Sequence, residues 1–484
     1  MSAAHIALSR FGYGLRLGER PPADPKAFLL RQIEAFDPSP PILKGRDNTS
    51  DRAGEILELL RMERARQKSA LTGSAADLEQ VDQAAKRAAM SREPESLVNS
   101  LPEDLRRASL DGARILRGDI RLKIDMAVES PAPMIERLVH FWSNHFSVTA
   151  GKPGTQHQVG NLEFFAIRPH VLGRFSDMVK AAALHPAMLM YLDQFQSIGP
   201  NSPIQMRLRR RGLNENLARE IMELHTLGVG GGYDQGDVTE FARALTGWTV
   251  AGLARLDRFT QVQPGGAAFA NVAHEPGART ILGRTYRAEG AKQALDILDD
   301  LAAHPSTARF VATKLARHFA GDTPPQNLVA RLEQNFLRTG GDLASLTRTL
   351  IAAPECWTAD PVKYRQPVEW LISSLRLVGA GGDRRAERPV PGMLRQLGQQ
   401  PWGAPSPAGY DDIAASWAGP DALFRRVDLA ERIARQVAAG DVIGHAETAF
   451  PGALSDHTRL WLSRAESDQQ ALGLLLVSPE MMRR

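Results

Sequence analysis

The stretch from Asn214 to Val250 constrains the fold most, because it predicts two helices joined by a glycine-rich loop. On a helical wheel at about 100° per residue, the apolar residues of its first part share one face, which predicts that this face is buried. These residues are Leu217, Ile221 and Leu224. The stretch therefore predicts a helical hairpin, a rigid frame of the kind on which functional loops are often mounted.

The loop of this hairpin is unusually rich in glycine. Four of the seven residues from Gly230 to Gly236 are glycine, which lets the backbone approach a ligand closely. The loop lacks the Gly-Lys-Ser/Thr of a phosphate loop, and it follows a helix rather than a strand, so nucleotide binding is not expected. Gly231 and Gly232 are instead candidates for a lid or a ligand cradle.

Capping signals delimit the two helices. Gly228 stands where a left-handed residue ends a helix, which places His225 in the last turn beside exposed carbonyl groups. Asp237 followed by Glu240 predicts a capping box at the start of the second helix. The buried stripe of that helix consists of Val238, Phe241, Ala242 and Leu245.

The polar face of the first helix carries the candidate site. It consists of Asn216, Arg219, Glu220 and Glu223. Two carboxylates one turn apart, beside an arginine and an amide, suit acid–base catalysis or a divalent metal ion. The same stripe also suits a solvated face with an Arg219–Glu223 ion pair. His225 shares a face with neither carboxylate in a regular helix, so the glutamate–histidine pairing of di-iron bundles is not expected.

A second helix with candidate residues has the sequence MIERLVHFWSNHF and follows prolines at 131 and 133. Its buried stripe consists of Ile135, Leu138, Val139, Trp142 and Phe146. His145 lies on the flank of this stripe, so we expect it to be buried and to need a hydrogen-bond partner. We predict that Glu220 faces inward and either hydrogen-bonds to this helix or shares a ligand with it. The alternative for His145 is a purely structural role, with its hydrogen bonds satisfied within the core. Asn144 is a further binding candidate.

Helical periodicity along most of the chain predicts an all-α protein with one large domain over residues 1–484. A minor β-hairpin is expected near Thr280 to Tyr286, in the run RTILGRTY. The Gly/Pro-rich segment from Gly379 to Gly419 predicts an irregular late loop packed through its aromatic rings. Residues 51–95 have a thin apolar stripe, which predicts a protruding or mobile helical arm.

Composition excludes several classes of protein. The formal charge of +4 is spread mostly over scattered arginines, and the one basic cluster, RLRRR at 207–211, lies in a proline-containing segment, so no nucleic-acid binding is predicted. Cys356 is the single cysteine, which excludes an intrachain disulfide and a cysteine metal cluster. There is no run of eighteen apolar residues and no signal-like start, which predicts no membrane span and a cytoplasmic location.

The central stretch, together with ERLVHFWSNHFSV, HEPGARTILGRTY, KYRQPVEWLISSLR and LGLLLVSPEMMRR, is similar to the bacterial family called domain of unknown function 1800 over essentially the whole chain. Many members carry a histidine where this chain has Ser143, which weakens any metal site that needs both imidazoles. Around Gly409 and Tyr410 the chain also lacks the usual Gly-Trp-Pro-Gly run. Members often lie beside genes for a second family resembling sulfatases and alkaline phosphatases, which implies such a partner, and some members are exported.

Two hypotheses of function follow. The first is an enzyme with a His/Asn/Glu site on the central helix. Glu220, Glu223 and His145 are its catalytic candidates, Asn216, Arg219 and His225 are binding candidates, and a divalent metal is an optional cofactor. The second is a non-catalytic helical scaffold that binds the sulfatase-like partner. A cavity lined by the cluster would favour the enzyme, and a stoichiometric partner without metal would favour the scaffold.

Overall fold

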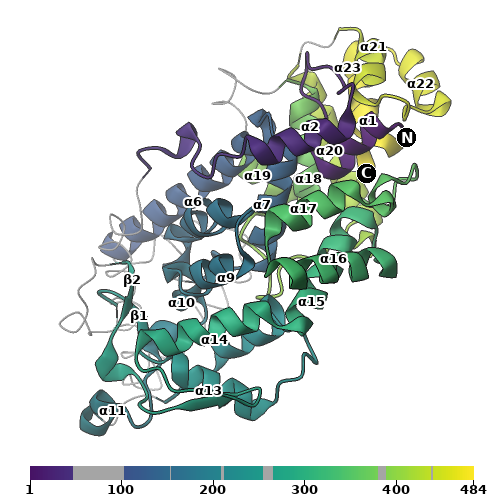
Figure 1. The fold of residues 1–484 in the computed structure, drawn as a ribbon. Helices are drawn as coiled ribbons and strands as arrows, with labels where there is room; N and C mark the ends of the chain where they lie inside the picture. The colour runs from purple at the N-terminus through teal and green to yellow at the C-terminus, as the bar shows by residue number, and fades with distance from the viewer. Residues whose placement is uncertain (47–102, 153, 209–211, 254–264, 380–388, 438–439) are drawn as a thin grey trace.

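The computed structural model of the chain describes residues 1–46, 103–152, 154–208, 212–253, 265–379, 389–437 and 440–484 (Figure 1). The arm predicted at 51–95 lies outside the described residues. Within them the protein is mostly helical, which confirms the predicted all-α class. None of the helices in these ranges is long and apolar enough to cross a membrane.

The helices of the first half of the chain are α1 (Ala3–Ile6), α2 (Pro25–Glu34), α6 (Glu103–Glu129), α7 (Pro133–His145), α8 (Val159–Asn161), α9 (Phe175–Ala183), α10 (Pro186–Tyr191), α11 (Pro203–Leu208), α12 (Asn216–Glu220) and α13 (Gln235–Leu245). Those of the second half are α14 (Ala291–Ala303), α15 (Pro305–Ala320), α16 (Gln326–Thr339), α17 (Leu343–Ala352), α18 (Pro367–Leu377), α19 (Val390–Leu397), α20 (Pro420–Arg435), α21 (Val442–Ala449), α22 (Asp456–Ser463), α23 (Asp468–Leu476) and α24 (Pro479–Met482).

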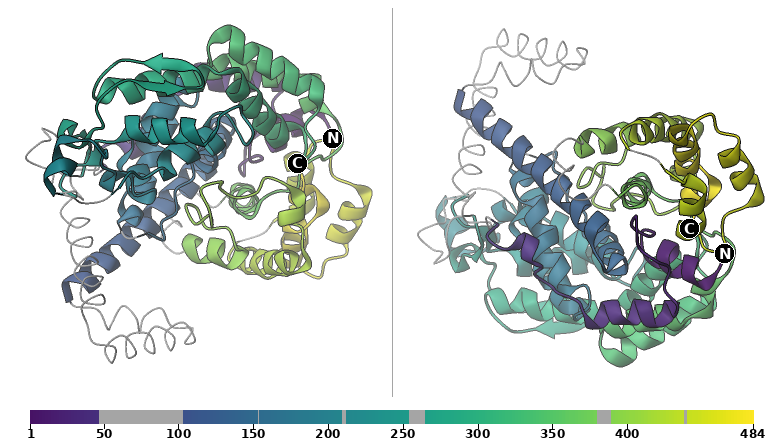
Figure 2. Two further views of the ribbon diagram at one scale, coloured as in Figure 1. Left: turned by 90° about the horizontal axis from the view of Figure 1, so that it is seen from below. Right: turned by 90° about the horizontal axis from the view of Figure 1, so that it is seen from above.

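Helix α18 lies at the centre of the C-terminal part of the fold. Every one of its residues is buried, and Figure 2 shows it almost end-on with other helices around it. Its start is fixed by Pro367 in the first turn and by a capping box between Gln366 and Glu369. A helix that is buried all round can place a charged side chain in the core only where that charge is paired, which matters for Glu369 below.

Two short antiparallel strand pairs complete the fold. β1 (Trp248–Val250) pairs with β2 (Ala267–Phe269), and β3 (Arg279–Ile281) pairs with β4 (Arg284–Tyr286). The second pair is the hairpin predicted near Thr280 to Tyr286. Its two-residue turn has positive φ at both Leu282 and Gly283, which matches the twist of the strands.

The central hairpin forms, but its first helix is not regular. After five residues α12 passes into a π-helical turn, η7 (Ile221–His225). The wider turn changes the faces of later side chains: Leu224, predicted to be buried, is half-buried, and His225 is buried. Gly228 has a φ of 83°, as predicted for the residue that ends this helix.

The second helix of the hairpin starts earlier than predicted. Helix α13 begins at Gln235, and its capping box joins Asp234 and Asp237, whose carboxylates each accept a backbone N–H of the other at 3.0 Å. The predicted box of Asp237 and Glu240 is therefore wrong. Glu240 instead forms an ion pair with Arg243.

Helix α7 forms as its sequence predicts, and it carries the candidate residues Asn144 and His145. Its apolar stripe is buried throughout. Among its neighbours in the folded chain are α15, α18 and the segment 408–413 of the late loop, which lie far from it in sequence (Figure 1). The place where these elements meet is hollow.

Candidate functional site

A cavity of about 220 Å³ lies between α7, α15 and the segment 408–413. Most of the residues that line it are polar, unlike those of the surrounding core. It is lined by His140, Phe141, Asn144, His145, Lys314, Arg317, His318, Gln366, Ala408, Tyr410, Asp411, Asp412 and Ile413. The cavity therefore brings together three histidines, two cationic side chains and two aspartates from three distant parts of the chain.

Lys314 and His145 form a directional pair in this wall. The Nζ atom of Lys314 lies 3.0 Å from Nδ1 of His145, and Nε2 of His145 lies 3.0 Å from the carbonyl oxygen of His225. Since a carbonyl oxygen can only accept, Nε2 carries the proton and Nδ1 accepts from the lysine. His145 is thus held in one tautomer, with both ring nitrogens in use.

Burial and mutual repulsion control the protonation of this pair. Burial lowers the pKa of Lys314 from 10.5 to about 8, with Arg317 contributing and Asp412 opposing. Burial, Lys314 and His225 hold the pKa of His145 well below its usual range, so this imidazole is neutral. Burial also lowers the pKa of His225 to about 3. The titratable group of this wall near neutral pH is therefore the lysine rather than a histidine.

The wall of the cavity contains a second paired histidine. Nδ1 of His318 lies 2.8 Å from a carboxylate oxygen of Asp412, so this ring nitrogen carries the proton. Asp412 also accepts from Lys363, at 3.1 Å, and from the side chain of Gln366, at 3.2 Å. Although burial alone would raise it, His318 and Lys363 hold the pKa of Asp412 far below its usual range. Asp412 is therefore a fixed negative charge that orients His318.

Asn144 attaches the late loop to α7. Its side-chain amide donates to the backbone oxygen of Tyr410 and accepts from the Tyr410 N–H, both at 2.8 Å. The adjacent Gly409 has a φ of 83°, and a Cβ there would overlap the backbone oxygen of Asn144. Glycine is therefore required for the loop to lie this close to the helix.

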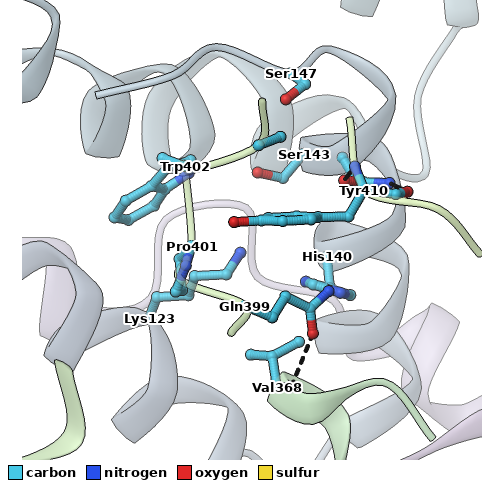
Figure 3. Close-up of a pocket in the computed structure, with 11 residues that line it drawn as sticks. Lys123, His140, Ser143, Ser147, Val368, Gln399, Pro401, Trp402 and Tyr410 are labelled. Atoms are coloured by element: carbon cyan, nitrogen blue, oxygen red, sulfur yellow. Dashed lines mark hydrogen bonds between the residues drawn. The ribbon is translucent and has the colours of Figure 1, made fainter. Parts of the chain in front are cut away.

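Tyr410 separates the cavity from a smaller pocket of about 30 Å³, since both are lined by Tyr410, Asn144 and His140. Figure 3 shows the Tyr410 ring projecting into the middle of the smaller pocket, with Trp402 and His140 among the residues around it. Trp402 is anchored there by an indole N–H bond to Glu163 at 3.1 Å. The prediction that the late loop packs through its rings is correct for these two residues.

A buried ion triad joins helices that surround the cavity. Glu369 of α18 is fully buried between Arg137 of α7 and Arg484, and it accepts two hydrogen bonds of 3.1 Å from Arg484. Although burial alone would raise it, these two guanidinium groups hold the pKa of Glu369 well below its usual range. Arg484 also donates to the backbone oxygen of His318 at 2.9 Å, so the triad ties α7 and α18 to α15.

The family model described as "Protein of unknown function (DUF1800)" matches residues 6–483, essentially the whole chain. The chain belongs to this family. The resemblance drawn from the sequence motifs is thereby confirmed. No curated protein and no solved structure matches the chain.

In this DUF1800 protein the polar residues of the central helix lie apart from the cavity. Asn216 is exposed at the start of α12. Arg219 pairs with Glu215 at 3.2 Å and with Gln235 at 2.9 Å, so the predicted Arg219–Glu223 ion pair is not formed. The sequence pattern was misleading here because a partner one turn earlier competes for the same guanidinium.

Glu220 and Glu223 are half-buried. Burial and the charge of Glu223 raise the pKa of Glu220, and the Glu220 carboxylate makes no hydrogen bond to the described residues. The predicted bond from Glu220 to the helix of His145 is therefore not formed, because both ring nitrogens of His145 are occupied by Lys314 and by the His225 carbonyl.

Of the remaining candidates of the DUF1800 chain, one lies beside the cavity and two lie in the glycine loop. His225 is buried, and its ring centroid lies 6.1 Å from that of His145, so its side chain belongs to the surroundings of the cavity. Gly231 accepts a hydrogen bond from Ser306 at the start of α15, at 3.1 Å, whereas Gly232 is exposed. Within the described ranges, no three His, Cys, Asp or Glu side chains are grouped so that they could hold a metal ion.

Sequence reasoning missed Lys314, His318 and Asp412. Lys314 and His318 lie one turn apart in VATKLARHF, and His318 falls on the buried stripe of α15 with Leu315. A histidine on a buried stripe was the available signal. Asp412 carried no such signal, because it lies in an irregular loop whose path periodicity does not predict.

Proposed function

We propose that the protein is an enzyme whose active site is the cavity between α7, α15 and the segment 408–413, and that Lys314 is its acid–base group. The observation that carries this proposal is the contact of Lys314 with a neutral imidazole, in a cavity of about 220 Å³. Among the described residues, Lys314 has no carboxylate partner, whereas an amine that serves only stability in a core is normally paired with one.

A proton-transferring group works best when its pKa lies near the pH at which it acts. Burial lowers the pKa of Lys314 to about 8. Roughly a tenth of such an amine is neutral at pH 7, against fewer than about one in a thousand for an ordinary lysine. Lys314 can therefore exist in both protonation states near neutral pH, and part of its side chain is open to the cavity.

His145 is a positioning residue in this proposal. Its Nε2–H is bonded to the His225 carbonyl, so Nδ1 remains a fixed acceptor that holds one N–H of Lys314. The other two positions of the Lys314 nitrogen are left for a ligand. His318, oriented by Asp412, is a further polar group of α15 in the wall of the cavity.

The alternative remains a non-catalytic scaffold that binds a sulfatase-like partner. Under the scaffold hypothesis neither the cavity nor the state of Lys314 matters for function. A stoichiometric partner that co-purifies equally with the wild-type protein and with Lys314→Met would favour the scaffold. A site on the central helix that uses Glu220 and Glu223 has less support, because these carboxylates are away from the cavity.

Competitive labelling of amines tests the proposal. The protein is exposed to a trace of acetic anhydride over a range of pH, and the extent of acetylation at each lysine is measured by mass spectrometry. Lys44 is exposed and provides the control. We expect the reactivity of Lys314 to reach half its maximum near pH 8, well below the value of about 10.4 for an ordinary lysine. A Lys314 amine that is unreactive, or that titrates like an ordinary lysine, would overturn the proposal.

A further inference from the structure

The polar side chains in the wall of the cavity differ in how fully they are bonded. Asn144 uses its amide to hold Tyr410, and Gln366 bonds Asp412 and accepts from Gln399 at 2.7 Å. Asp412 is committed to His318, Lys363 and Gln366. These residues build the cavity, and they have little bonding capacity left for a ligand.

Two cationic side chains of α15 keep hydrogen-bond donors that are free for a ligand. Lys314 and Arg317 are three residues apart, so their side chains leave the same face of the helix. Neither forms an ion pair with any described carboxylate, although Asp412 lies in the same wall. The Nε of Arg317 donates to the backbone oxygen of Asp322 at 3.3 Å, which leaves its two terminal nitrogens unbonded among the described residues.

The unused acceptors of the wall are few. Asp411 is exposed and already accepts from the hydroxyl of Ser416 at 2.9 Å. Nε2 of His318 is buried and has no partner among the described residues. A ligand in this cavity therefore faces two side chains that can only donate, and both carry positive charge near neutral pH.

From this arrangement we infer that the cavity binds an oxyanion group of a small molecule, a carboxylate, phosphate or sulfate, between Lys314 and Arg317. This inference rests on the proposed function, because it takes the same cavity as the active site. A guanidinium presents parallel N–H groups that match two oxygens of such an anion, and an ammonium adds a point charge. One water needs about 10–15 Å³ of such space, so about 220 Å³ leaves room for the rest of a small substrate.

The bound anion and the proton of Lys314 are coupled. A negative charge beside Nζ favours the ammonium form, so we expect anion binding to weaken as pH rises above the pKa of free Lys314. The other charged or titratable groups in or beside the cavity wall are His140 and His145 of α7, His225 of η7, Arg317 and His318 of α15, and Tyr410, Asp411 and Asp412 of the late loop. Burial lowers the pKa of all four histidines and raises that of Tyr410, and His318 and Lys363 hold the pKa of Asp412 far below its usual range, so Lys314 dominates this dependence between pH 7 and 9.

Titration calorimetry with sodium phosphate, sulfate and acetate at pH 7 and constant ionic strength tests the inference. We expect at least one of these anions to bind the wild-type protein with a Kd of order 10 mM or tighter. Arg317→Gln should weaken that binding about tenfold or more, since a charged hydrogen-bond donor is lost. Lys314→Arg keeps the charge and should retain binding. Arg348→Gln is the matched control, because Arg348 is exposed on α17 and does not line the cavity.

The inference is overturned if none of the three anions binds the wild-type protein up to about 50 mM, or if Arg317→Gln and Arg348→Gln bind equally well. Amine labelling of the same variants separates it from the proposed function. Should Arg317→Gln bind normally while Lys314 still titrates near pH 8, the oxyanion site fails and the acid–base proposal stands. Should Arg317→Gln lose binding while Lys314 titrates like an ordinary lysine, at about pH 10.4, the oxyanion site stands and the acid–base proposal fails.

Discussion

The Nζ atom of Lys314 lies 3.0 Å from Nδ1 of His145, although the two residues are 169 positions apart in the sequence. Helix α7 supplies the imidazole and α15 supplies the amine, and the carbonyl of His225 fixes which ring nitrogen accepts. This contact joins the three parts of the chain on which the account of the site depends.

Replacing Glu369 with Gln should destabilise the protein by about 3–5 kcal/mol, because the buried guanidinium groups of Arg137 and Arg484 lose their common counter-charge. Urea unfolding at pH 7 measures this change. The control is Glu355→Gln, which breaks a partly exposed ion pair with Arg331 and should cost no more than about 1 kcal/mol. Equal costs for the two variants would contradict a buried triad.

The Glu369 prediction also has a pH dependence. The pKa of Glu369 is held well below 4.5 in the folded protein, so the unfolded chain binds this proton more readily. The stability that Glu369 contributes is fully present above about pH 4.5 and is lost as pH falls through the lower folded pKa. The difference between the wild-type protein and Glu369→Gln should therefore shrink in acid.

Gly409→Ala should cost more than Gly283→Ala. Both glycines have positive φ, 83° and 76°, so both substitutions carry a backbone strain of about 1 kcal/mol. Only at 409 does the new Cβ overlap another atom, the backbone oxygen of Asn144, whereas Gly283 faces open space. Unfolding free energies and the exchange rate of the Tyr410 amide measure the effect. Similar costs, with unchanged exchange at Tyr410, would show that the loop is not held against α7.

Glu220→Gln should raise stability at pH 7, by less than about 1 kcal/mol. Burial and Glu223 raise the pKa of Glu220, so the folded state binds this proton more readily than the unfolded chain. The unfavourable charge is fully present at neutral pH and disappears as pH falls below about 4.5, where the variant should gain nothing. Melting temperatures at both pH values check this. A loss of several kcal/mol would instead mean that Glu220 has a buried partner and would revive the site on the central helix.

The sequence predicts the local elements of the fold better than the contacts of the site. Helix α7 was predictable, because two prolines mark its start and its buried residues follow one stripe. Burial of His145 and its need for a partner also followed from that stripe, and it is 1% exposed. The hairpin at β3 and β4 was predictable from a short run bounded by glycines.

The partner of His145 was not predictable, because periodicity orders residues within a helix and says nothing about which distant helix lies opposite. Glu220 was the wrong partner for a further reason: the π-helical turn of η7 alters the register of the central helix, and it brings the His225 carbonyl to His145. Lys314 resembles any surface lysine in its sequence context. Only the folded chain shows that it lies in a cavity and has no carboxylate partner among the described residues.

The central claim is that the Lys314 amine changes protonation near neutral pH. NMR titration of protein labelled with ¹³C at lysine Cε, with Lys314→Arg to assign the signal, measures its pKa directly. A value of about 8, well separated from the other lysines, is the predicted result. A value near the ordinary 10.4 would contradict the account, because Lys314 would then be a permanently charged side chain unable to exchange protons with a substrate.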